Sequence, residues 1–162
     1  MNTKQIWQAI NNNPKIYNYF DGVYSLDTLC EIRKKPKLII CNTDPSYLPG
    51  KHWVLFYFRT NKVEFFDSTA SSIHSYGDEF VKFIFKFAEK CESNSVAIQK
   101  KGTDVCGEYC LYYAYLKCNG YTMSQIIKKL LQINSKRIKN IVNRIFIYCK
   151  HSTCHFVQNA TK

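Results

Sequence analysis

Long apolar runs are missing from the 162 residues of this chain. A helix that crosses a bilayer needs about 20 consecutive apolar residues, and no segment approaches that length. The first residues, MNTKQIWQAINNN, also lack the apolar core of a signal peptide. We therefore expect a protein without membrane contact that works inside its host cell, in a compartment that the sequence leaves open.

Glycine and proline are scarce, at six and four residues, and they form no cluster that would mark a linker. Internal repeats and low-complexity stretches are missing as well. Hydrophobic residues make up 46% of the chain and aromatic residues 15%, which is enough for a core and excludes a disordered chain. We expect one domain over residues 1–162, acting as a monomer.

Acidic residues stop at Glu108. The remaining segment, 109–162, holds nine Lys and Arg residues and no Asp or Glu, within a chain of net charge +11. A codon bias towards lysine would explain the lysines but not the missing acids. A basic surplus of this size favours an anionic partner, most often nucleic acid. Two basic helices are predicted near residues 124–132 and 136–148, with no acid to neutralise Lys128, Lys129, Lys136, Arg137, Lys139 and Arg144. We predict DNA binding there, with Lys128, Lys129, Lys136 and Arg137 as the contacts.

The eight cysteines, without a signal peptide, predict reduced thiols rather than disulfides. Near the end of the chain, Cys149, His151, Cys154 and His155 offer the atoms that zinc prefers. They lack the paired CxxC spacing of structural zinc sites, so no metal site is predicted and their role is left open.

Apolar patterning predicts an α+β fold, with a central mixed β-sheet packed by helices. Strands are expected over residues 38–41, 53–58, 62–67 and 95–99, and the second and third would form a hairpin through Thr60 and Asn61. Helices are expected over residues 3–10, 78–90 and 106–118, besides the two basic ones. Residues 17–36 are predicted to be irregular.

Hydrolysis by a cysteine needs a thiolate, a base, a group that orients the base and donors for the oxyanion. Cys106 opens a predicted helix, where the helix dipole lowers a thiol pKa, and Gly107 leaves room for a substrate backbone. His52 begins a strand, and Asp67 ends the neighbouring one. Gln99 offers an amide donor.

Each of these residues also has a structural interpretation. His52 could be a surface histidine, Asp67 could cap the turn that follows it, and Gln99 alone signifies nothing. Cys106 has seven rival cysteines, with Cys110 one turn further along the same predicted helix. His74, Glu64 and Asp104 are competing partners.

The order of five segments favours the catalytic interpretation over the structural one. These segments are Asn42-Thr43, Gly50-Lys51-His52-Trp53, Phe65-Phe66-Asp67-Ser68, Gln99 and Asp104-Val105-Cys106-Gly107. In this order they resemble the adenovirus-type maturation cysteine proteases, which have relatives in virophages and in Polinton/Maverick elements and, more distantly, among SUMO-deconjugating proteases. The order His, acid, Gln, Cys is permuted relative to papain-like enzymes. The resemblance covers about residues 19–118, and Tyr19-Phe20, Gly22 and Tyr24 support it upstream.

The resemblance implies an adenain/SUMO-protease-like fold and a catalytic triad of Cys106 as nucleophile, His52 as general base and Asp67 as the residue that orients the imidazole. Gln99 would help to form the oxyanion hole, and Trp53 would be a wall of the substrate cleft. The adenoviral enzymes commonly have Glu where this chain has Asp67, whereas the SUMO-type relatives have Asp. Chemistry of this kind requires no cofactor.

We therefore expect an endopeptidase that cleaves viral or mobile-element capsid precursor proteins after Gly-Gly or Gly-X and is packaged in the virion. Adenoviral members are stimulated by DNA and by a short peptide joined through a disulfide, for which Cys91 lies in roughly the right region. One alternative is a protease that removes a ubiquitin-like modifier. Another is an inactive relative that binds nucleic acid.

Overall fold

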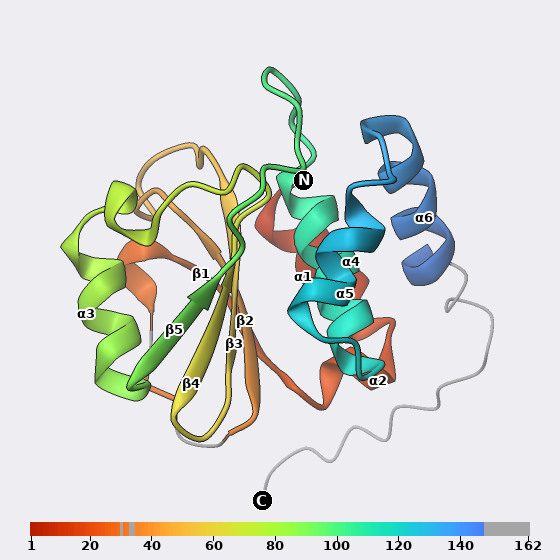
Figure 1. Ribbon diagram of the computed structural model, residues 1–162. Coiled ribbons are helices and arrows are strands. Elements are labelled where there is room, and N and C mark those ends of the chain that lie inside the picture. The colour runs from red at the N-terminus through yellow and green to blue at the C-terminus, as the bar shows by residue number, and fades with distance from the viewer. Residues whose placement is uncertain (30, 33–34, 148–162) are drawn as a thin grey trace, which may run out of the picture.

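The computed structural model describes residues 1–29, 31–32 and 35–147. A five-stranded sheet lies between two layers of helices, with the 3-10 segments and α3 on one face and most of the helices on the other (Figure 1). The strands are β1 (Phe20–Ser25), β2 (Lys37–Asn42), β3 (Trp53–Phe58), β4 (Lys62–Phe66) and β5 (Lys90–Ser93). The helices are α1 (Thr3–Asn11), α2 (Pro14–Tyr17), α3 (Asp78–Phe87), α4 (Cys106–Cys118), α5 (Met123–Leu130) and α6 (Ser135–Ile147), with 3-10 segments at Leu26–Thr28 and Ile73–Tyr76.

The strands lie in their order along the chain. Both edge strands, β1 and β5, run parallel to their neighbours, while the central strand β3 is antiparallel to both β2 and β4. The sheet is therefore mixed, and the predicted α+β class with a central mixed sheet is confirmed.

Side chains alternate between the two faces of the sheet, as the period of a strand requires. Leu38 and Ile40 of β2 belong to the core formed with α1, α4, α5 and α6, whereas Ile39 and Cys41 belong to the core under α3. Since both faces are covered, the middle strands are mostly apolar along their whole length and do not alternate between apolar and polar residues. Helix α4 packs against β3 and is buried on most of its surface.

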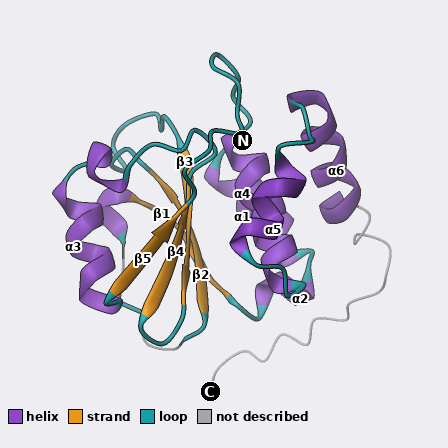
Figure 2. Cartoon of the chain, in the orientation of Figure 1, coloured by secondary structure: helices purple, strands orange, loops and turns teal. Residues whose placement is uncertain are grey.

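Two local predictions were wrong. Residues 17–36 contain β1 and a 3-10 turn instead of an irregular stretch, because β1 pairs with the buried strand β2 despite its Asp and Gly residues. The strand expected at residues 95–99 is absent, and the edge position is taken by the polar strand β5 a few residues earlier. Figure 2 shows the segment after β5 as a loop that leads to α4.

Within the described part of the chain, no helix is long and apolar enough to cross a membrane.

Candidate active site

The start of β3, the end of β4 and the start of α4 meet at one end of the sheet, beside the N-terminus (Figure 1). Because β3 and β4 are antiparallel neighbours, the residue before β3 and the residue after β4 come together there. A cavity of about 420 Å³ opens at this point. We call it the His52 cleft; it is lined by Met1, the residues 50–53, Thr69, the segment 99–104 and Cys106.

The loop before β3 fixes the position of His52. Asn42, the last residue of β2, accepts backbone hydrogen bonds from Asp44 (2.9 Å) and Lys51 (3.3 Å) through its Oδ1 atom. Gly50 has φ +86, and a Cβ added to it would lie 2.6 Å from the Asn42 side chain. Glycine is therefore required at this turn both by the left-handed backbone and by the close approach of Asn42.

Asp67 holds one nitrogen of the His52 ring. The Nε2 atom of His52 lies 2.7 Å from Asp67 Oδ1. Asp67 is only 1% exposed, and burial alone would raise the pKa of its carboxyl. Hydrogen bonds from His52, from the Tyr76 hydroxyl (2.6 Å) and from the backbone N–H of Thr69 (2.8 Å) lower that pKa below the ordinary range. The carboxylate is thus ionised and fixed in position.

Cys106 is the cysteine that the structure brings to His52. Burial alone would raise the pKa of its thiol, but a hydrogen bond with His52 and the backbone N–H groups of Trp53 and Gly107 lower it below the ordinary value. The helix begins after Val105, whose side chain cannot act as an N-cap acceptor. The N–H groups of the first turn therefore point towards the cleft without a side-chain cap, where they favour negative charge.

The His52 imidazole is stabilised in its protonated form. Burial lowers its pKa, but the hydrogen bonds to Asp67 and then to Cys106 outweigh burial and raise the pKa to about 9. Since the pKa of Cys106 is lowered at the same time, the geometry favours the thiolate–imidazolium pair over the neutral pair.

Gln99 lies in the loop after β5 and lines the same cleft as Cys106. Its Oε1 atom accepts a hydrogen bond from the Ser68 hydroxyl (2.7 Å), and its Nε2 group donates to the carbonyl of Thr103. An amide nitrogen carries two hydrogens, so one remains for an oxyanion.

Trp53 lines the cleft, and Gly107 is buried next to it. A Cβ added to Gly107 would lie 3.4 Å from Trp53 Cδ1 and 3.2 Å from the Met1 Cβ. The Trp53 indole N–H donates to the Met1 carbonyl at 3.0 Å. Gly107 is thus enclosed by Trp53 and Met1, and it is not among the residues that line the cleft.

Of the rival residues, Asp104 lines the cleft with an exposed side chain, whereas Cys110, Glu64 and His74 lie away from it. Cys110 is fully buried and donates to the Trp53 carbonyl (3.4 Å), and burial raises its thiol pKa well above the ordinary value. Glu64 is held inside the protein by the Tyr113 hydroxyl (2.8 Å) and the Lys117 ammonium (2.7 Å). His74 is exposed in the turn before α3.

Sequence reasoning missed two residues that support this site, Tyr76 and Asn94. Tyr76 reaches Asp67 from the 3-10 turn after β4, and its ring stacks near the His52 ring with centroids 6.2 Å apart. Asn94 follows β5 and binds the backbone of Asp67. No local pattern marks either residue, because each acts across a distance in sequence that only the fold closes.

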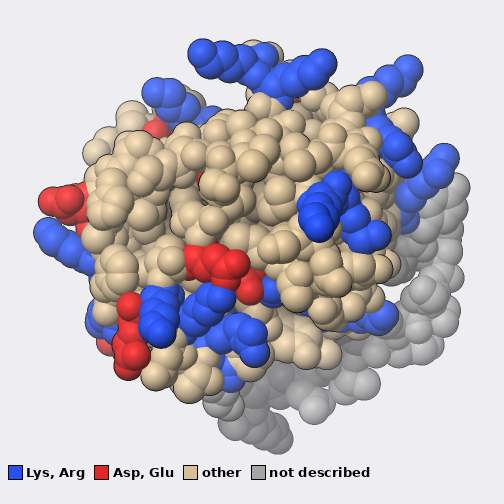
Figure 3. All heavy atoms as spheres, in the orientation of Figure 1, with Lys and Arg blue, Asp and Glu red and all other residues tan. Residues whose placement is uncertain are grey.

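The basic residues predicted to bind DNA, Lys128, Lys129, Lys136 and Arg137, are all exposed on α5 and α6. Figure 3 shows Lys and Arg without acidic atoms on the visible surface over these helices. The expectation that no acid neutralises this group was wrong for Lys139. Its ammonium lies 3.7 Å from Asp104 in the loop before α4, because the fold brings the two segments together.

The described residues include no group of three His, Cys, Asp or Glu side chains placed to hold a metal ion. Cys149, His151, Cys154 and His155 lie outside the described residues.

Comparisons with known proteins add a distant likeness. No protein-family model matches the chain, and no curated protein matches it in sequence. Among solved structures, the ASFV pS273R protease superimposes with a TM-score of 0.48 at 16% sequence identity, over 80% of this chain. This chain spans 61% of the length of that protease.

Proposed function

We propose that this protein is a cysteine endopeptidase with Cys106 as nucleophile, His52 as general acid and base, and Asp67 as the residue that orients His52. The observation that carries the proposal is the linked geometry of three side chains from three separate elements. Asp67 binds Nε2 of His52 at 2.7 Å, and His52 in turn lowers the pKa of the Cys106 thiol.

In this mechanism the Cys106 thiolate attacks the carbonyl carbon of the scissile peptide bond. The oxyanion accepts hydrogen bonds from Gln99 and from a backbone N–H at the start of α4. The protonated His52 gives its proton to the leaving amine, which departs and leaves an acyl-enzyme on Cys106. A water molecule, deprotonated by His52, then hydrolyses the thioester and restores the starting state.

Asp67 keeps its charge throughout this cycle. Its carboxylate holds the Nε2–H of His52, so the other ring nitrogen is directed at the thiol. Because Asp67 accepts further hydrogen bonds from Tyr76, Thr69 and Ser71, its carboxylate is held in place and sets the direction of the imidazole.

The substrates we propose are viral or mobile-element capsid precursor proteins, cut after Gly-Gly or Gly-X pairs. The support is the sequence resemblance together with Trp53, whose ring lines the cleft beside Cys106. Packaging in the virion, stimulation by DNA through α5 and α6, and an activating peptide linked at Cys91 are parts of the same proposal. Cys91 lies on the edge strand β5 and is partly exposed, which would permit such a link.

The decisive experiment is thiol labelling with a limiting amount of a thiol-reactive Gly-Gly peptide, followed by mapping of the adduct by mass spectrometry. We expect selective modification of Cys106 among the eight cysteines, and loss of both labelling and peptide cleavage in Cys106→Ala. Cys110→Ala is the matched control and should keep both. Even labelling of several cysteines, or cleavage by Cys106→Ala, would refute the proposed mechanism.

A further inference from the structure

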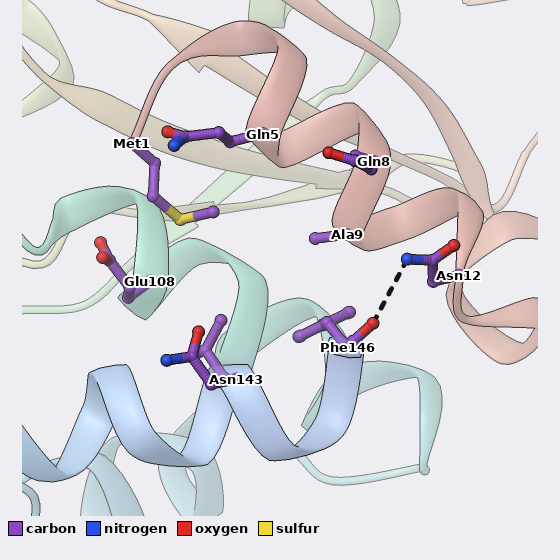
Figure 4. Close-up of a pocket in the computed structure, with 9 residues that line it drawn as sticks. Met1, Gln5, Gln8, Ala9, Asn12, Glu108, Asn143 and Phe146 are labelled. Carbon is purple, nitrogen blue, oxygen red and sulfur yellow. Dashed lines mark hydrogen bonds between the residues drawn. The ribbon is translucent and has the colours of Figure 1, made fainter. Parts of the chain in front are cut away.

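A second cavity, of about 340 Å³, lies between α1, α6 and the first turn of α4. Met1 lines both this cavity and the His52 cleft, so the two lie next to each other. Figure 4 shows the cavity with Glu108 rising from the start of α4 towards Met1 and Gln5. We call it the Glu108 pocket; the proposed mechanism leaves it unused.

The carboxylate of Glu108 is the unusual feature of this pocket. The residue is only 8% exposed, and its Oε2 atom is fully buried without a hydrogen-bond partner among the described residues. Burying a carboxylate oxygen without a hydrogen-bond donor costs free energy, because the oxygen has lost its water and gained no donor in exchange. The N-terminal dipole of α4 offsets only part of that cost.

The rest of the lining suggests what would satisfy Glu108. Exposed amide side chains, Gln8 and Asn143, stand at the mouth. Asn12 donates its Nδ2 group to the Phe146 carbonyl (3.4 Å), which leaves its Oδ1 atom as an acceptor (Figure 4). The walls between these polar groups are apolar and are formed by Ala9, Val142 and Phe146.

An apolar wall that leads to a buried carboxylate matches a long cationic side chain. The methylene groups of arginine or lysine can lie along the apolar wall while the charged end meets the carboxylate. A neutral ligand would leave the charge of Glu108 uncompensated. A metal ion would find one carboxylate only, since no metal-binding group of His, Cys, Asp and Glu exists within the described residues.

We infer that the Glu108 pocket is a substrate subsite that takes an arginine or lysine side chain of the peptide being cleaved. The inference rests on the proposed protease function. Glu108 follows Cys106 by two residues in the same helix, so the two side chains point to opposite sides of α4, which is about 10–12 Å across with its side chains. One residue of an extended peptide spans about 3.3 Å. The basic residue of the substrate therefore stands within a few positions of the cleaved bond.

The test uses Gly-Gly peptides in which each flanking position carries, in turn, arginine or its neutral analogue citrulline. At one position we expect arginine to be preferred by about tenfold or more in kcat/KM. In Glu108→Gln that preference should fall to about one, whereas Glu79→Gln, an exposed glutamate on α3, should keep it. Equal use of arginine and citrulline at every position, or an unchanged preference in Glu108→Gln, would overturn the inference.

Two further measurements separate this inference from the proposed function. Binding of the same labelled peptides to Cys106→Ala needs no catalysis, and the arginine preference should persist there. If binding shows the preference but the wild type cleaves nothing, the protease proposal fails and the pocket stands. Without peptide, Glu108→Gln should raise the melting temperature, because a neutral amide costs less to bury than a carboxylate oxygen that has no donor; an unchanged or lower melting temperature would overturn the inference.

Discussion

Asn94 holds the backbone of Asp67 on both sides. Its Oδ1 atom accepts the Asp67 N–H at 3.0 Å, and its Nδ2 group donates to the Asp67 carbonyl at 2.7 Å. Asp67 stands just beyond the end of β4, where no further ladder bonds fix the chain. Asn94 thus replaces the missing strand pairing. Because Asp67 binds the His52 imidazole, the position of that imidazole depends on Asn94 as well.

We therefore predict that Asn94→Ala destabilises the protein by about 1–3 kcal/mol, since buried donors and acceptors lose their partner. It should also lower kcat more than it raises KM, because His52 is no longer held against Cys106. Denaturant unfolding and steady-state kinetics measure the two effects. Asn140→Ala, an exposed position on α6, is the control. A loss of stability with unchanged kcat would show that Asn94 is structural only.

The second prediction concerns pH. The activity should rise as Cys106 loses its proton, below the usual thiol range, and fall near pH 9 as His52 loses its proton. In Asp67→Asn the hydrogen bond and charge that raise the pKa of His52 are weakened, so the alkaline limb should move to lower pH. The pH profile of kcat/KM for both proteins checks this. An alkaline limb that does not move would remove Asp67 from the mechanism.

Local signals in the sequence were enough to select two of the residues that the structure brings together, His52 and Cys106. His52 follows a turn that requires Gly50, and Cys106 opens a helix, so both have a recognisable local setting. Tyr76 and Asn94 have none, since they reach Asp67 only after α3 and β5 have packed around β4.

The edges of the sheet were hard to predict for a related reason. The apolar residues Val96 and Ile98 suggested a strand, but Val96 is 45% exposed in a loop. The true edge strand β5 is polar, with Lys90 and Glu92, because an edge strand with exposed residues needs little apolar surface.

The third prediction concerns substrate shape. Trp53 lines the cleft together with Cys106, and we expect its ring to limit the width around the scissile bond. Replacing the glycine before the cut by valine should lower kcat/KM by about 10- to 200-fold, because a β-branched side chain cannot turn away from the walls. Replacements after the cut should cost less. Competition between the two peptides in one reaction measures the ratio directly, and equal rates would contradict a narrow cleft.

The fourth prediction separates a structural ion pair from the site. Lys117 is paired with Glu64 at 2.7 Å, and both side chains are nearly buried. Lys117→Met should destabilise the fold by about 3–5 kcal/mol, because Glu64 loses its counter-charge, and should leave Cys106 labelling unchanged. The control is Lys86→Met, which breaks an exposed pair with Glu31 and should cost no more than about 1 kcal/mol. Loss of Cys106 labelling in folded Lys117→Met would place Glu64 in the catalytic network instead.

The last prediction concerns α5 and α6. Contacts between lysines and phosphates release counterions, so DNA affinity should fall steeply with salt and depend little on sequence. Changing Lys128, Lys129, Lys136 and Arg137 together to Gln should weaken binding to every duplex and reduce the log–log salt slope by roughly four.

The matched control removes the same charge from exposed positions outside α5 and α6, by changing Lys4, Lys15, Lys82 and Lys90 to Gln. If binding depends only on the net charge of +11, both variants should lose affinity equally. If α5 and α6 form the contact surface, the first variant should lose much more affinity than the control, while Cys106 in both reacts normally with a small thiol probe. A salt titration of duplex affinity for the three proteins decides between these outcomes, and equal slopes in all three would leave the basic helices as a solvated surface.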